Sequence, residues 1–234
     1  MNRERVESIY RKFCRQFGVN IENGVLNERT NLKFATMPYI GSNYFLARKR
    51  LLFVGMDIGK DETPGKIQSL EERRVAIECD VNFNPHIAGT FCTALYYLKT
   101  EYDWEDVWDK FSSYPTYSQA TKVQHHKDGE NPISFVALTN LHKFVTIDRE
   151  NRTGDVDRKF LEKEVEESWL LKEIKLLRPD IVFLQSKTMQ LSPDTIQQVK
   201  DSNVRLLRTQ HPAFRPKTKG EKSPISYVNN FEEI

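Results

Sequence analysis

The chain has little of what a metal site or a disulfide framework needs. Its 234 residues include three cysteines, Cys14, Cys79 and Cys92, with no C-x-x-C pair. An odd, widely spaced set of this kind favours reduced thiols and is typical of a cytoplasmic protein. Metal and iron–sulfur sites need clustered cysteine or histidine ligands. We therefore expect no metal, no iron–sulfur cluster and no other cofactor.

Long apolar runs and a strong charge imbalance are also missing. No apolar run approaches the ~20 residues that span a membrane, and the charged segment 1–7 has no apolar core of the kind found in signal peptides. The formal net charge is +2, which by itself does not indicate a nucleic-acid-binding protein. A chain of this length with 38% hydrophobic residues predicts one domain, residues 1–234. We expect a monomer with no membrane partner.

Short apolar runs alternate with amphipathic segments along the chain. Turn residues bound four runs that we interpret as buried strands: 51–54, 133–138, 180–185 and 203–208. Apolar residues at three- and four-residue steps predict helices, which are 3–17, 67–81, 86–98, 157–177 and, more briefly, 192–200. This alternation predicts an α/β fold with three layers, α/β/α, around a central four-stranded parallel sheet.

Three of the predicted strands are followed closely by a polar residue that can take part in catalysis. These residues are Asp57, Asn140 and His211, and a parallel sheet brings such strand ends to one edge, where α/β proteins bind ligands. A carboxylate can orient water or stabilise a cationic sugar, a carboxamide can read a planar edge, and a histidine can hydrogen-bond an oxyanion. Taken singly, Asp57 or Asn140 is equally a turn residue or helix cap, and His211 a structural histidine before Pro212.

Four blocks, in this order, resemble the motifs of the uracil-DNA glycosylase superfamily. Leu52-Phe-Val-Gly-Met-Asp-Ile-Gly59 resembles the strand and glycine-bounded loop that carry the catalytic acid. Leu138-Thr-Asn-Leu-His-Lys143 is similar to the strand-end asparagine motif, and Thr209-Gln-His-Pro-Ala-Phe214 to the closing His-Pro motif. Residues 157–185 look like the helix-then-strand block of the family's iron–sulfur branch, whose cysteines this chain lacks.

The resemblance implies a uracil-DNA glycosylase-like fold. Its core covers about residues 50–216, with an N-terminal extension, 1–48, and an insert at about 100–131.

The resemblance also implies an enzyme of DNA repair that flips a damaged base out of DNA and hydrolyses its N-glycosidic bond. Asp57 would position the water, Asn140 would recognise the base and His211 would hydrogen-bond the departing base. The implied base pocket also includes Gly55, Met56, Gly59 and His86, with Phe83 as an alternative stacking residue. The implied DNA contacts are Phe214, Arg215 and Lys143.

Two positions leave the substrate open. Ile58 stands where the family commonly has proline, and Gly59 where the uracil-specific branch has tyrosine. The resemblance therefore implies that the excised base is uracil or a related deaminated base. Two alternatives are a non-catalytic nucleic-acid-binding protein of the same fold and a hydrolase of free nucleosides.

Overall fold

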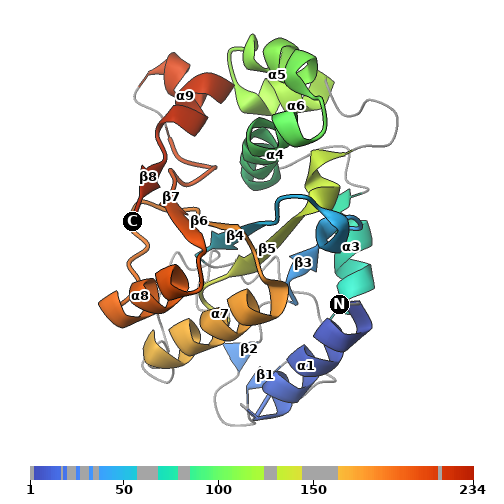
Figure 1. Cartoon of the computed structure of the whole chain (residues 1–234), viewed down its shortest axis with the longest axis vertical. Helices are drawn as coiled ribbons and strands as arrows, with labels where there is room; N and C mark the ends of the chain where they lie inside the picture. The colour runs from blue at the N-terminus through green and yellow to red at the C-terminus, as the bar shows by residue number, and fades with distance from the viewer. Residues whose placement is uncertain are drawn as a thin grey trace.

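A six-stranded mixed sheet forms the centre of the molecule (Figure 1). The computed structural model describes residues 3–16, 18–19, 25–26, 32–33, 37–56, 68–78, 85–123, 131–143, 163–215 and 218–234. The sheet order is β3 (Tyr39–Ile40), β5 (Val136–Asn140), β4 (Leu51–Gly55), β6 (Ile181–Leu184), β7 (Arg205–Arg208) and β8 (Glu232–Glu233). The inner strands β5, β4, β6 and β7 run parallel, and the two edge strands are antiparallel to their neighbours. A separate two-stranded sheet pairs β1 (Val25–Leu26) with β2 (Leu32–Lys33).

The predicted α/β class is confirmed, but the sheet is larger and more varied than the four parallel strands expected. All four predicted runs contribute a strand, and together they form the inner, parallel part. The run 133–138 begins as a 3₁₀ turn, η4 (Pro132–Phe135), because the side chain of Asn131 caps it by accepting a 3.0 Å hydrogen bond from the Ile133 amide. Strand β5 therefore begins only at Val136.

Helices cover both faces of the sheet (Figure 1). One face packs against α1 (Arg3–Gln16), α7 (Lys163–Leu177) and α8 (Pro193–Asp201). The other packs against α4 (Pro85–Leu98), α5 (Glu105–Ser112), α6 (Tyr117–Val123) and α9 (Pro224–Asn229). Alternate strand residues supply the two cores, as the two-residue period of a strand requires. In β4, Leu51 and Phe53 face the α4 side while Leu52 and Val54 face the α7 side.

The insert and the C-terminal segment are parts of the core. The insert contains η3 (Lys99–Glu101), α5 and α6, and it buries Trp104, Trp108, Phe111 and Tyr117 on the α4 side. The C-terminal segment forms η6 (Lys219–Lys222), α9 and β8. Within the parts of the chain that the structure describes, no helix has both the length and the apolar character to cross a membrane.

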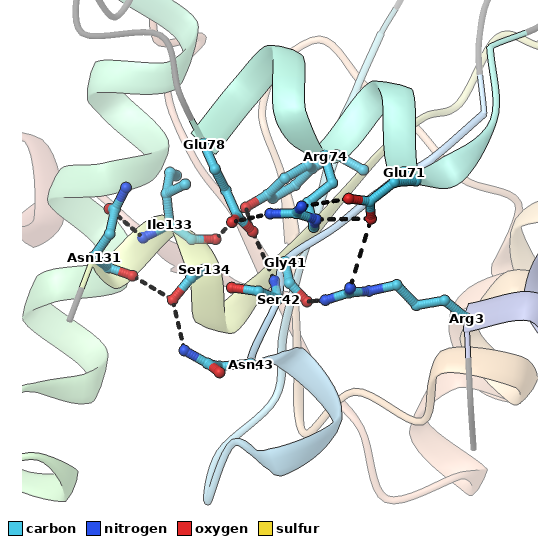
Figure 2. Close-up of polar contacts among 11 residues, drawn as sticks. Arg3, Gly41, Ser42, Asn43, Glu71, Arg74, Glu78, Asn131, Ile133 and Ser134 are labelled. Atoms are coloured by element: carbon cyan, nitrogen blue, oxygen red, sulfur yellow. Dashed lines mark hydrogen bonds and ion pairs between the residues drawn. The ribbon is translucent and has the colours of Figure 1, made fainter. Parts of the chain in front are cut away.

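A polar network fixes α3 (Leu70–Glu78) beside the β3 edge (Figure 2). Arg74 lies between Glu71 and Glu78 on the same helix. The Glu78 carboxylate accepts hydrogen bonds from the Ser42 amide at 2.7 Å and from the Tyr39 hydroxyl at 3.1 Å. The network therefore holds the helix that follows residues 57–67, a segment that lies outside the described residues.

The turn after β3 also needs a glycine. A Cβ atom on Gly41 would lie 2.1 Å from the carbonyl oxygen of Ser134. Arg3 of α1 donates a 2.8 Å hydrogen bond to the Gly41 carbonyl oxygen. This close approach ties α1, the β3 turn and η4 together.

Candidate active site at the carboxyl edge of the sheet

The carboxyl ends of β4, β5 and β6 place three residues on one face of the sheet. Gly55 pairs with Asn140 in the register of β4 and β5. Side chains two residues apart in a strand point to the same face, so Gly55 lies on the α4 side together with Leu51 and Phe53. Asn140, four residues after Val136, lies on the α4 side for the same reason. Gln185 follows Phe183 in the same way. The α4 side of this edge therefore carries a glycine, an asparagine and a glutamine in neighbouring strands.

The carboxamide of Asn140 lies over Gly55. A Cβ atom built on Gly55 would be 2.6 Å from Asn140 Oδ1, so the absence of a side chain at position 55 gives the carboxamide its place. Asn140 is half-buried. Among the described residues its side chain has no hydrogen-bond partner, which leaves its donor and its acceptor free for a ligand. A carboxamide whose donor and acceptor are both free can form hydrogen bonds with the planar edge of a ligand that offers one acceptor and one donor.

A buried ion pair supports the Asn140 end of β5 from the α7 side. Lys143 Nζ lies 2.6 Å from Glu173 Oε1, and the side chains are 3% and 0% exposed. Lys143 also donates to the Asn140 carbonyl oxygen and to Thr139 Oγ1, the latter at 2.8 Å. The Tyr10 hydroxyl of α1 donates to the same Glu173 oxygen. Burial lowers the pKa of Lys143, which Glu173 opposes, and burial raises the pKa of Tyr10.

Lys143 therefore does not lie where a DNA phosphate could reach it. Its ammonium group is enclosed by Glu173, Thr139 and the Asn140 carbonyl oxygen. The sequence predicted a DNA contact for this lysine, and we assign it instead to holding the strand end that carries Asn140.

Two histidines meet at the other side of the same edge. The rings of His86, at the start of α4, and His211, after β7, are 4.5 Å apart between centroids and nearly perpendicular, at 81°. The Ala213 amide donates a 3.1 Å hydrogen bond to His211 Nδ1. When the imidazole is neutral, its proton is therefore on Nε2, which is then a donor. Burial and, to a smaller extent, the charge of Lys222 lower the pKa of His211.

A glycine of α4 and two tyrosine hydroxyl groups fix the turn that carries His211. Gly89 of α4 packs directly on Pro212, because a Cβ atom there would lie 2.7 Å from the proline Cβ. The Tyr117 hydroxyl, from the insert, donates to the Pro212 carbonyl oxygen. The Tyr227 hydroxyl of α9 donates to the Gln210 carbonyl oxygen at 3.1 Å. The insert and the C-terminal segment thus position His211.

Gln185 joins the two halves of the site and was missed by the sequence reasoning. It follows β6, which lies between β4 and β7, and it is buried. Its Nε2 atom donates a 2.8 Å hydrogen bond to Thr90 Oγ1, one turn after His86 on α4. Its place as the last residue of the third predicted strand, 180–185, was the available signal, because Asn140 and His211 were found from the ends of predicted strands.

The remaining predicted residues are distributed around this edge. The half-buried Met56 packs toward the α7-side core, and its carbonyl oxygen accepts from the His142 amide at 2.9 Å. Phe214 packs against the α4-side core, with Lys222 Nζ 5.3 Å from its ring centroid, and Arg215 is exposed. Asp57 and Gly59, together with the alternative stacking residue Phe83, lie outside the described residues.

Asn140 and His211 follow strands that are not neighbours in the sheet. Strands β5 and β7 are separated by three strand spacings, or about 14 Å, and the interval holds Gly55, with the Asn140 carboxamide over it, and the buried Gln185. The site can therefore present a carboxamide from one side and a neutral imidazole from the other. In the described ranges, no group of three or more histidine, cysteine or acidic residues is placed to hold a metal ion.

Comparison of the chain with family models, with curated proteins and with solved structures gave no match.

Proposed function

We propose that the protein is a DNA glycosylase that hydrolyses the N-glycosidic bond of uracil or a related deaminated base. The observation that carries this proposal is the placement of Asn140 and His211. The two residues follow β5 and β7, which flank β4 and β6, so both lie at the carboxyl edge of the sheet, and the Asn140 carboxamide lies over Gly55.

The inner sheet supports a uracil-DNA glycosylase-like fold in this proposal. Across the sheet the parallel strands lie in the order β5, β4, β6, β7. If they are numbered 1 to 4 along the chain, this order is 2-1-3-4. The order changes direction beside β4, the strand that precedes Asp57 in the sequence. Ligands of open α/β sheets bind at such a switch point.

The proposed reaction assigns one task to each side of the site. Asn140 recognises the polar edge of a flipped base with its free carboxamide. As the bond between the sugar and the base breaks, its electron pair moves to the base, and negative charge develops on a base oxygen. His211 donates the Nε2 proton in a hydrogen bond to that oxygen. Asp57 orients the water that adds to the cationic sugar carbon, and the water's second proton passes to solvent.

Base release from labelled oligonucleotides tests the proposal. A panel containing uracil, hypoxanthine or mismatched bases would be incubated with the protein and scored for alkali-labile abasic sites. We expect release from at least one substrate. Asn140→Ala, His211→Gln and Asp57→Asn should each slow it by about 10²-fold or more, as is typical for groups that act on the transition state.

A matched histidine variant controls for general damage. His142 Nδ1 lies 2.7 Å from Glu166 Oε2 of α7, so His142→Gln should leave base release unchanged. Folded protein that releases no base from any substrate overturns the proposal. Salt-dependent DNA binding that survives Asp57→Ala without abasic product identifies a non-catalytic binding protein. Activity on free nucleosides without DNA affinity identifies a nucleoside hydrolase.

A further inference from the structure

A basic hollow lies at the opposite, amino-terminal edge of the sheet. Its volume is about 470 Å³, which is within the range of small-molecule sites. It is bounded by the start of β4, the end of α7 and the turns that lead into β6 and β7. The buried residues of its lining include Ala47, Ile174, Pro179 and Val204. None of these residues takes part in the candidate active site.

Four cationic residues line this hollow, and two of them have no side-chain partner in the part of the chain that the structure describes. The lining includes Arg48, Arg50, Lys175 and Arg178. Arg48 donates to the Glu101 carbonyl oxygen at 2.7 Å, and Arg50 to the Arg178 carbonyl oxygen at 3.4 Å. Among the described residues, the side chains of Lys175 and Arg178 make no hydrogen bond or ion pair, and both are exposed.

Among the described lining residues, one carboxylate lies beside these charges. Asp180 is the acidic residue of the lining, and its Oδ2 atom accepts a 2.7 Å hydrogen bond from the Arg50 amide. The lining thus has a formal excess of three positive charges, four cations against one carboxylate. A hollow lined by one sign of charge concentrates counter-ions of the opposite sign.

The backbone at Arg178 strengthens the case for a ligand. Arg178 follows α7 with a φ of 51°, a left-handed conformation that glycine adopts freely and that side chains with a Cβ disfavour. Helices commonly end on glycine at such a position. Here the position is occupied by Arg178, which lines the hollow and whose side chain makes no hydrogen bond or ion pair among the described residues.

We propose that this basic hollow binds a small anion that carries several phosphate groups. Arginine guanidinium groups bind phosphate oxygens in a bidentate way, and lysine adds a point charge. The described residues of the lining include no aromatic side chain, so the phosphate groups, rather than a stacked base, are the recognised part of the ligand. The proposal uses residues that the glycosylase hypothesis does not need and is independent of it.

Titration calorimetry with sodium tripolyphosphate, in a phosphate-free buffer of low ionic strength, tests the proposal on the full chain. Pyrophosphate, inorganic phosphate and sulfate serve as comparison ions. We expect one site, affinity that falls in the order tripolyphosphate, pyrophosphate, phosphate, and weakening by added salt. Arg178→Gly should lower the affinity about tenfold through loss of a charge-assisted contact, and Lys175→Gln should lower it in the same direction.

The glycine variant separates binding from folding. Arg178→Gly removes a charge but also relieves the left-handed backbone, so the melting temperature should be unchanged or higher. Asn203 is the matched control, because it lines the same hollow with a φ of 57° and no charge. Asn203→Gly should leave the affinity unchanged. Absence of tripolyphosphate binding, equal binding of sulfate, or equal affinity in Arg178→Gly would overturn the proposal, as would binding of an oligonucleotide but not of tripolyphosphate.

Discussion

At the scale of single residues, the protonation state of His211 decides what the site can do. Burial is the larger cause of its lowered pKa, and the Lys222 charge is the smaller one. The neutral, donating form therefore persists to lower pH than for an ordinary histidine, whose pKa is about 6.5. Because the folded state resists protonation of His211, the contribution of this residue to stability is lost as pH falls below that ordinary value.

The same residue gives a prediction about the pH dependence of base release. The acidic limb of the pH–rate profile should lie below the ordinary histidine pKa, because activity needs the neutral imidazole. Lys222→Gln removes the smaller cause of the shift, so the limb should move to higher pH. Rate profiles of kcat/KM and an NMR titration of His211 measure both effects. Lys187→Gln, which removes an exposed lysine paired with Glu232, should not move the acidic limb. A shift in Lys187→Gln equal to that in Lys222→Gln would contradict the assignment of the effect to Lys222.

At the scale of secondary-structure elements, the contact between α4 and the His211 turn depends on Gly89. In an open helix, Gly→Ala stabilises by about 0.5–1 kcal/mol. Here a new Cβ would lie 2.7 Å from Pro212 Cβ and 3.2 Å from the Tyr227 hydroxyl oxygen. We expect Gly89→Ala to destabilise the protein by about 1–3 kcal/mol through overpacking and to slow base release by displacing His211. Denaturant unfolding and single-turnover rates test this, and a stabilised, fully active variant would contradict it.

The elements also show how far the sequence could be interpreted. The four inner strands were predictable because each is an apolar run bounded by turn residues. The edge strands β3 and β8 were not, since each has two residues and two residues carry no periodic signal. The position of Asn140 could be predicted from its strand. The inward direction of the Lys143 side chain could not, because it depends on Glu173 of α7, which lies 30 residues later in the chain. Likewise, nothing local in the sequence shows that Tyr117 and Tyr227 hold the His211 turn.

At the scale of the whole molecule, the two edges of the sheet carry different chemistry. The carboxyl edge presents the Asn140 carboxamide and the imidazole of His211, and the amino edge presents a basic hollow. Strand β4 separates them with five residues, which is about 15 Å of extended chain. Sites at such a separation that share no partners generally respond to mutation independently.

We therefore expect the two proposed activities to be separable. Arg178→Gly should leave base release unchanged, and His211→Gln should leave the affinity for tripolyphosphate unchanged. The double variant should show the sum of the two single effects, expressed as free energies, since neither residue contacts the elements around the other. Base-release rates measured with and without saturating tripolyphosphate provide the direct comparison. Competitive inhibition by tripolyphosphate that disappears in Arg178→Gly would show instead that the basic hollow lies on the path of bound DNA, and that the two edges serve one substrate.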